Sequence, residues 1–400
     1  MKTERLQVLS QTFHDSLLDD TLQFWVEHGI DRQYGGFLTF LGRKGELLSP
    51  EKGMWVHGRM TWLFARLYNE LEQRPEWLDL ARHGIDFIKR HGFDDTGRMY
   101  FTVARDGRRL RMRRYPFTEI FGVMAFAEYG RAAGDRASIT KARELMELVE
   151  KLISRPEALS PKFYPEHRQT RSHSIAMIRI NTYQVLRQSD PEGSYDHAIG
   201  RAIEEVFHYF VKPERRVLLE TVGANGELLE GPVGRCVNPG HAIETAWFML
   251  EEAKRSGDKL LMQKALPILD WSLEIGWDGQ YGGLLSFVDV EGLQPEQVEW
   301  NMKYWWPQTE AIYATLLAYS MTHEERYLDW FDRTHDWAMQ HFPDRQYGEW
   351  FGYLHRDGSV ALDLKGNNWK GPFHLPRQQL YAHLLAKEML EHAARSTSTD

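Results

Sequence analysis

The feature that most constrains the fold is a helical repeat of apolar residues that recurs along almost the whole chain. Apolar side chains return at roughly every third or fourth position, as they do on one face of an amphipathic helix. The pattern predicts helices over residues 4–29, 55–73, 76–91, 118–133, 136–153, 171–188, 192–211, 239–256, 258–276, 303–321, 324–341 and 374–394. A chain built from these segments is predicted to be all-α.

The connections between these segments alternate in character. Some are short polar turns, such as Glu72–Pro75 and Arg255–Asp258, and short turns favour antiparallel neighbouring helices. The others are long and carry short strand-like runs. A phrase that begins Asp-x-Gln-Tyr-Gly recurs in these long connections at residues 31–37, 278–284 and 344–350. An apolar run and a polar turn with a glycine follow each copy, which predicts a short hairpin after a helix.

Pairs of helices joined by long, hairpin-bearing loops predict an (α/α)6 barrel, a closed ring with two concentric helix layers. An open solenoid of helix pairs is the alternative. The chain lacks alternating strand and helix patterns, which argues against a (β/α)8 barrel. In the barrel, the long loops gather at one mouth and the active site lies there. We expect one catalytic domain over residues 1–400, with a frayed tail after residue 395.

Composition narrows the class of protein. The net charge of -8 disfavours nucleic-acid binding, and the basic run Arg108–Arg114 is interpreted as an exposed turn. Met1–Asp19 contains no signal-peptide run, no segment is apolar for the length of a membrane span, and Cys236 has no second cysteine to pair with. These features predict a soluble cytoplasmic protein. Aromatic residues make up 13% of the chain, which suits either a large core or a sugar site.

Two histidines stand at predicted helix starts. His241 follows Pro239, a residue suited to the first helical turn, and Glu244 shares its helix face. A helix start and a nearby carboxylate move the pKa of a histidine in opposite directions, which suits a general base. A purely structural helix cap is the alternative. His374 has the same setting, because a Gly/Asn-rich loop precedes it and Pro376 follows it. The two together suggest an acid/base pair across one cavity.

Three further places carry candidate site residues. Trp306 and Glu310 begin another predicted helix, where an indole can stack on a sugar and a carboxylate can accept hydroxyl hydrogen bonds; two core tryptophans and a helix-start carboxylate are the alternative. Arg59 lies within a strongly apolar helix and therefore needs either a buried acid or an anionic ligand. His173 is a weaker candidate. No phosphate-binding loop, metal-binding motif or nucleophile elbow is recognisable.

At these residues the chain resembles the N-acylglucosamine 2-epimerase family, also called the renin-binding-protein family. Cellobiose 2-epimerases, mannose 2-epimerases and aldose–ketose isomerases are related to it. The resemblance extends over nearly the whole length. It is strongest in Trp55–Arg59, Phe117–Ile120, Asn238–Glu244, Trp305–Ala311 and Lys370–Arg377.

The resemblance implies an (α/α)6 barrel and inversion of C2 of an aldose through a cis-enediolate, without a metal or a nicotinamide cofactor. It implies that His241 and His374 transfer the protons and that Arg59 faces the enediolate charge. Glu310 and Glu244 would be polar partners of the substrate and the histidines. The residues implied to line the sugar pocket are Trp55, Phe117, Trp306 and Trp369, with His173 as a further substrate-binding candidate.

The resemblance also bears on the substrate. N-acetylglucosamine and N-acetylmannosamine are the sugars expected from the family. His173 and Gln308 depart from the pattern of classical N-acylglucosamine epimerases, so glucose and mannose, cellobiose, or isomerisation of mannose to fructose remain alternatives. A glycan hydrolase or a binding module is the alternative from another class. A small sugar is the expected partner, and a homodimer is compatible with the family; nucleic acid and membranes are not expected.

Overall fold

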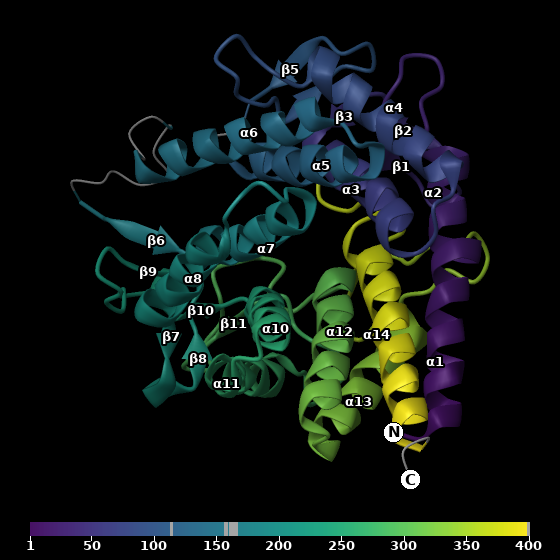
Figure 1. Cartoon of the computed structure of the whole chain (residues 1–400). Coiled ribbons are helices and arrows are strands. Elements are labelled where there is room, and N and C mark those ends of the chain that lie inside the picture. The colour runs from purple at the N-terminus through teal and green to yellow at the C-terminus, as the bar shows by residue number, and fades with distance from the viewer. Residues whose placement is uncertain (113–114, 156–158, 160–166, 398–400) are drawn as a thin grey trace.

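In the computed structural model, which describes residues 1–112, 115–155, 159 and 167–397, every helical segment predicted from the sequence is found. The helices form two layers (Figure 1). The inner layer consists of α3 (Met54–Glu70), α5 (Phe117–Ala133), α7 (His173–Ser189), α10 (Pro239–Ser256), α12 (Trp305–Thr322) and α14 (His374–Thr397). The outer layer consists of α1 (Thr3–Asp15) with α2 (Leu22–His28), α4 (Pro75–His91), α6 (Arg136–Ser154), α8 (Asp196–Glu205), α11 (Lys259–Gly276) and α13 (Glu325–His341).

The inner helices form a closed ring. Contacts run from α3 to α5, α7, α10, α12 and α14, and α14 returns to α3. Each outer helix packs on the inner helix next to it in the chain, with α1 against α14. Burial follows the layers: α5 is buried without interruption over residues 118–130, whereas α6 buries only one stripe. The fold is therefore the predicted (α/α)6 barrel, and the ring closure excludes the open solenoid.

Differences from the predicted boundaries have local causes. The first predicted helix is interrupted by a π-helical turn, Ser16–Thr21, and the segment that ends near residue 211 finishes in another, Val206–Phe210. Such a turn inserts a residue into the helix and shifts which side chains face the core. The helices predicted from residues 171 and 303 begin later, at His173 and Trp305, because the residues before them pair as strands, and the helix predicted from residue 192 begins at Asp196.

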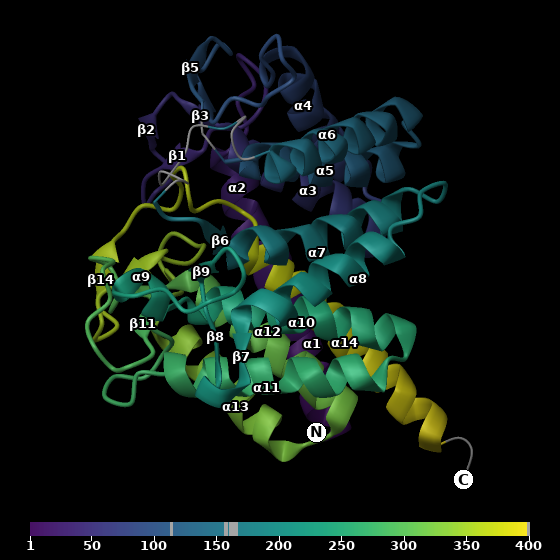
Figure 2. The same ribbon diagram turned by 90° about the vertical axis from the view of Figure 1, so that its left-hand side faces the viewer.

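Short antiparallel strands occupy the long loops, as predicted. They are β1 (Phe40–Leu41), β2 (Leu47–Ser49), β3 (Lys52–Gly53), β4 (Thr102–Val103), β5 (Arg109–Arg111), β6 (Thr170–Ser172), β7 (Val211–Lys212), β8 (Val217–Leu218), β9 (Thr221–Gly223), β10 (Cys236–Val237), β11 (Val288–Asp289), β12 (Lys303–Tyr304), β13 (Tyr353–Leu354) and β14 (Val360–Leu362). Their pairings are β1–β2, β3–β4–β5, β6–β9, β7–β8, β10–β11 and β12–β13–β14. In Figure 2, strands such as β1, β2, β11 and β14 gather on the left, at the mouth.

The repeated phrase forms the same structure each time. A β-bridge closes each copy, as between Trp277 and Leu284. The aspartate of each copy then accepts hydrogen bonds or ion pairs from a buried lysine and from an arginine of the next loop. Around Asp278, Lys303 Nζ lies 3.0 Å and Arg356 Nε 2.8 Å from the carboxylate. The corresponding groups are Asp31 with Lys52 and Arg105, and Asp344 with Lys365 and Arg43. We call these sets the Asp–Lys–Arg clusters.

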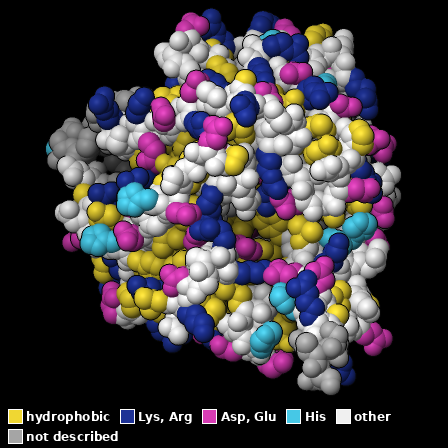
Figure 3. Space-filling view, in the orientation of Figure 1, with side chains coloured by type: hydrophobic (Ala, Val, Ile, Leu, Met, Phe, Trp, Pro, Cys, Tyr) yellow, Lys and Arg dark blue, Asp and Glu magenta, His cyan; other side chains and the backbone are white. Residues whose placement is uncertain are grey.

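The remaining expectations concern the surface and the ends. Arg109–Arg111 form the exposed strand β5 of the predicted basic turn, and residues 113–114 lie outside the described residues. The tail predicted to fray after residue 395 is helical as far as Thr397, and residues 398–400 are outside the description. Acidic and basic side chains are interspersed over the face in Figure 3. Among the described residues, none of the helices combines the length and apolarity that crossing a membrane requires.

Candidate active site

Apart from Trp369, which lies in the loop before α14, the candidate site residues lie in the first two turns of inner helices, at the mouth of the barrel. Strand β10 leads directly into α10 and β12 directly into α12, so each strand pairing holds the start of a helix in place. Asn238 caps α10, because its Oδ1 accepts a hydrogen bond from the backbone N–H of His241 at 3.0 Å. Pro239 then occupies the first turn. His374 is likewise the first residue of α14.

The two histidines contact the same indole. The ring centroid of Trp306 lies 5.2 Å from that of His241 and 5.5 Å from that of His374. The structure therefore brings the two candidate proton-transfer residues to one place. They are 133 positions apart in the chain and stand at the starts of two different helices, α10 and α14.

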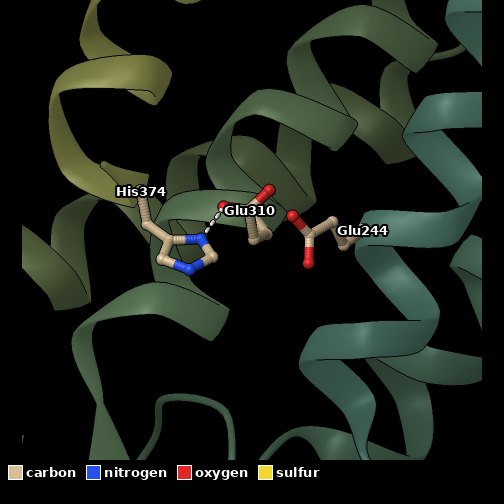
Figure 4. A group of neighbouring side chains, drawn as sticks. All are labelled: Glu244, Glu310 and His374. Carbon is tan, nitrogen blue, oxygen red and sulfur yellow. Dashed lines mark hydrogen bonds and ion pairs between the residues drawn. The ribbon is translucent and has the colours of Figure 1, made fainter. Parts of the chain in front are cut away.

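His374 is held by a buried carboxylate (Figure 4). Its Nδ1 lies 2.7 Å from Glu310 Oε1. Burial of the ring, and then the charge of Arg59, hold the pKa of His374 well below its ordinary value. A neutral imidazole next to a carboxylate donates the proton on Nδ1. Its Nε2 then carries a lone pair and is available as a base.

Glu310 has further donors that the sequence did not indicate. Trp247 Nε1 donates to Oε2 at 2.7 Å, and Arg377 Nη2 donates to Oε1 at 2.7 Å. The same guanidinium nitrogen donates to Glu244 Oε1 at 2.5 Å. Arg377 thus pairs with both buried carboxylates. It stands three residues after His374 in a motif noted from the sequence, where helical spacing was the available signal.

Glu244, Glu310 and His374 also meet the spacing of a metal site, since one ligand atom of each lies within 4.8 Å of the others. Figure 4 shows the carboxylates of Glu244 and Glu310 pointing toward each other from α10 and α12. However, the Oε1 atom of each of these two carboxylates already accepts a hydrogen bond from Arg377. The guanidinium supplies the positive charge that a metal would otherwise bring, so this donor set does not fit a metal ion.

His241 has a different partner, Glu220. His241 Nδ1 lies 3.0 Å from Glu220 Oε2. Burial lowers the pKa of His241, but the carboxylates around it, Glu220 first and then Glu244 and Glu310, together raise it by more, and the net pKa lies above the ordinary value. His241 therefore keeps its proton to a higher pH than His374 does. Glu220 lies in the irregular connection between β8 and β9 and belongs to no motif, so no sequence signal pointed to it.

Arg59 is buried without a matching carboxylate. Its guanidinium carbon lies 4.2 Å from the ring centroid of Phe121 and 4.6 Å from that of Phe373. No Asp or Glu among the described residues forms an ion pair with it, and its Nε has no hydrogen-bond partner. Burial lowers its pKa to about 9, so it remains charged at neutral pH. Of the two alternatives for Arg59, pairing with a buried acid is not seen among the described residues, which leaves an anionic ligand or a developing oxyanion.

The aromatic candidates form a wall beside Arg59. Trp55 stacks on Phe117 with the ring centroids 5.5 Å apart and the planes at 1°. Trp369 meets Trp55 edge-on at 5.5 Å and is 47% exposed. Gln308, by contrast, bonds both backbone groups of Leu284, so its side chain holds the loop in place.

His173 lies behind His241. It is fully buried, its Nε2 lies 2.8 Å from Thr245 Oγ1, and its ring centroid is 6.5 Å from that of His241. The hydroxyl of Thr245 donates to the carbonyl of His241, so it accepts its other hydrogen bond from His173. His173 therefore contacts the support of His241.

Known proteins with the same fold and sequence pattern were found. The family described as N-acylglucosamine 2-epimerase matches residues 35–374. The N-acylglucosamine 2-epimerase of Bos taurus is 37% identical over 367 residues, which cover 90% of this chain and 87% of the bovine protein. The solved cellobiose 2-epimerase of Bacillus thermoamylovorans superposes with a TM-score of 0.83 at 21% identity over 95% of this chain and 100% of its own. A solved D-mannose isomerase gives a TM-score of 0.75 at 17% identity, covering 96% and 97%.

The two solved structures share the barrel fold. The family match covers most of the chain, including the motifs that carry His241 and His374, and the bovine relative agrees with it. The chain belongs to the N-acylglucosamine 2-epimerase family.

Proposed function

We propose that this protein is a sugar 2-epimerase that interconverts N-acetylglucosamine and N-acetylmannosamine. The observation that carries the proposal is the placement of His241 and His374 beside one indole, that of Trp306, with opposite protonation preferences. Inversion at a carbon requires removal of a proton from one face and delivery to the other. Two histidines with unlike pKa values supply a base and an acid at once.

In the proposed first step, the sugar ring is open and His374 acts as the base. The hydrogen bond from its Nδ1 to Glu310 leaves the Nε2 lone pair free to take the proton from C2. The aldehyde at C1 makes that proton acidic, because the electron pair left on C2 moves onto O1. For an N-acetyl sugar the product is an enolate, with its negative charge shared by O1 and C2 and the acetamido nitrogen still bonded to C2.

Arg59 is proposed to stabilise that charge. A buried guanidinium without a carboxylate partner costs free energy in the empty site, and a developing oxyanion would compensate it. His241, which holds a proton through Glu220, then donates to C2 from the opposite face. The reverse reaction exchanges the roles of the two histidines. No step requires a metal or a redox cofactor.

Trp55, Phe117, Trp306 and Trp369 are proposed to contact the sugar, since indole and phenyl faces pack against C–H groups. The choice of an N-acyl sugar is supported by the bovine relative at 37% identity, which is named for that substrate. The likeness to the solved cellobiose 2-epimerase, at 21% identity, supports the fold only.

A glycan hydrolase is less consistent with the site. Hydrolysis needs two carboxylic groups on either side of the glycosidic bond. Glu244 and Glu310 instead bind the same nitrogen of Arg377, so neither is free to face a substrate across a cleft.

Product analysis in deuterated water tests the proposal. The protein is incubated with N-acetylglucosamine, N-acetylmannosamine, glucose, mannose and cellobiose, and products are followed by NMR. The expected result is deuterium at C2 of the 2-epimer, fastest with the N-acetyl sugars. Fructose formed from mannose would favour an aldose–ketose isomerase. Absence of exchange at C2 of every sugar would reject both reactions.

A further inference from the structure

Glu220 is a partly buried carboxylate beside the histidines, and the family motifs quoted from the sequence do not include it. Its backbone is fixed on both sides, since its carbonyl accepts from the N–H of His173 at 3.0 Å and its N–H donates to the carbonyl of Cys236 at 3.0 Å. These bonds attach it to the start of α7 and to β10. Its side chain therefore reaches His241 from a rigid piece of backbone.

The surroundings of Glu220 differ from those of Glu310. Arg377 and Trp247 donate to Glu310, so much of its charge is already compensated when it bonds His374. Among the described residues, no lysine or arginine pairs with Glu220; its ion-pair partners are the two histidines, with Oε2 lying 3.0 Å from His241 Nδ1 and 3.6 Å from His173 Nδ1. Similar histidine–glutamate pairs therefore sit in opposite electrostatic settings.

We infer that Glu220 is a positioning residue for the proposed epimerisation: it fixes His241 with Nε2 toward the sugar and keeps that imidazole charged, so that it serves as the acid. The inference rests on the proposed function. The titratable groups that face His241 are Glu220 from the β8–β9 connection, His173 of α7, Glu244 of α10, Glu310 of α12 and His374 of α14. Only Glu220 among them hydrogen-bonds the imidazole of His241.

The charges support this reading. The two histidines outweigh the effect of burial on Glu220 and lower its pKa to about 2, so it is ionised across the working range. Glu244 is paired with Arg377 and contributes less to His241 than Glu220 does. Burial keeps the pKa of His173 below its ordinary value. Of the two histidines beside Glu220, the positive charge therefore rests on His241.

The test is an NMR titration of the full chain with labelled histidines and without sugar, the His241 signal being assigned with His241→Asn. In the unsubstituted protein His241 should titrate above the ordinary histidine value of about 6.5. Glu220→Gln should lower this pKa by about one to three units, the effect of losing a carboxylate in contact. Glu220→Asp should restore part of the shift. Glu230→Gln changes an exposed glutamate of the loop between β9 and α9 (Pro232–Arg235) and should leave His241 unchanged.

Activity gives a second readout. In Glu220→Gln the alkaline limb of kcat should move to lower pH by the same shift, with KM little changed, whereas loop damage would lower kcat equally at every pH. An unchanged His241 pKa in Glu220→Gln would overturn the inference. Should that variant not fold, a His241 pKa below about 6.5 in the unsubstituted protein would overturn it. Because the titration uses no sugar, its outcome does not depend on the proposed reaction. Failure of C2 exchange would reject the epimerase itself and can be told apart from an unchanged His241 pKa.

Discussion

His374 and His241 show how the same pair of residue types can have opposite properties. Each imidazole bonds a glutamate through Nδ1. Arg377 compensates the glutamate of His374, and Arg59 adds a further positive charge, whereas Glu220 has no cation besides histidine among the described residues. The difference in pKa between the histidines follows from these neighbours rather than from the histidines themselves.

This difference predicts the pH dependence. The base must be neutral, so kcat/KM should rise as pH increases through the low pKa of His374. The acid must be charged, so kcat/KM should fall as pH increases through the raised pKa of His241. The profile should be a plateau that includes the ordinary histidine value of about 6.5. Initial rates measured over a range of pH check this profile. A kcat/KM that already declines as the pH is lowered from neutrality would contradict the prediction.

Glu310→Gln tests the hydrogen bond that selects the tautomer of His374. An amide can donate to Nδ1, which places the proton on Nε2 and removes the base. We expect kcat to fall about 10³- to 10⁴-fold, as when a triad aspartate becomes asparagine. Steady-state kinetics and circular dichroism are the measurements. Glu325→Gln, an exposed glutamate of α13, is the control, and a loss below tenfold in Glu310→Gln would contradict the assignment.

The sequence indicated candidates only within motifs: it missed Glu220, which stands in none, and Arg377, whose role its motif did not show. His241, His374 and Glu310 could be recognised because each stands in a motif near the start of a helix. Glu220 comes from an irregular connection, and its role depends on a contact between segments separated by 21 residues. No local pattern encodes such a contact. The pairing of Glu244 with Arg377 is likewise visible only after α10 and α14 are placed in the ring.

At the scale of elements, the close approach of α10 and α12 sets the position of Trp306. A Cβ on Gly240 would lie 2.4 Å and 2.5 Å from carbons of the Trp306 ring. Only glycine permits this contact at that point in the first turn of α10. The indole is thereby pressed against the face of the helix that carries His241.

Gly240→Ala should therefore displace the indole. The new methyl group requires Trp306 to move. Pro307 Cγ lies 3.0 Å from the new Cβ and limits where the indole can go. Because small displacements of positioning groups cost up to about 10²-fold, we expect kcat/KM to fall at least tenfold, mainly through KM. Gly200→Ala on α8 has open space around the new Cβ and should keep full activity. Equal behaviour of the two variants would count against the role of Trp306.

The apolar pattern predicted the helices well, because outer helices such as α6 bury one stripe and inner helices such as α5 are apolar on all sides. The starts of α7 and α12 were predicted a few residues too early, since β6 and β12 pair with other loops. Strand pairing of two or three residues leaves no periodic signal. The repeated Asp-x-Gln-Tyr-Gly phrase did predict the hairpins, because turn residues recur at fixed positions.

At the scale of the whole molecule, the Asp–Lys–Arg clusters connect consecutive loops of the mouth. The cluster of Asp344 joins the last long loop to the first, because Arg43 comes from the β1–β2 hairpin. Asp344 and Lys365 are almost completely buried. The ring is thus closed at its mouth by charge pairing and elsewhere by contact between α14 and α3.

Asp344→Asn should weaken this closure. Removing the carboxylate leaves Lys365 buried without its partner, a change that typically costs about 3–5 kcal/mol. Urea unfolding measures the loss, with the exposed Asp363→Asn as the control. Although burial raises the pKa of Asp344, Arg43 and then Lys365 lower it to about 2. Its contribution should therefore be complete above pH about 4 and disappear as pH falls toward 2. A variant as stable as the control would show that the cluster is dispensable.

The most direct test of the central claim measures exchange of the C2 proton with deuterated water in single-histidine variants. If His241 and His374 serve opposite faces, His241→Asn and His374→Asn should each lose epimerisation. Each should still exchange the C2 proton of one sugar of the epimer pair, and the two variants should exchange opposite sugars. A variant that still inverts C2, or a pair of variants that exchange the same sugar, would contradict two opposed histidines.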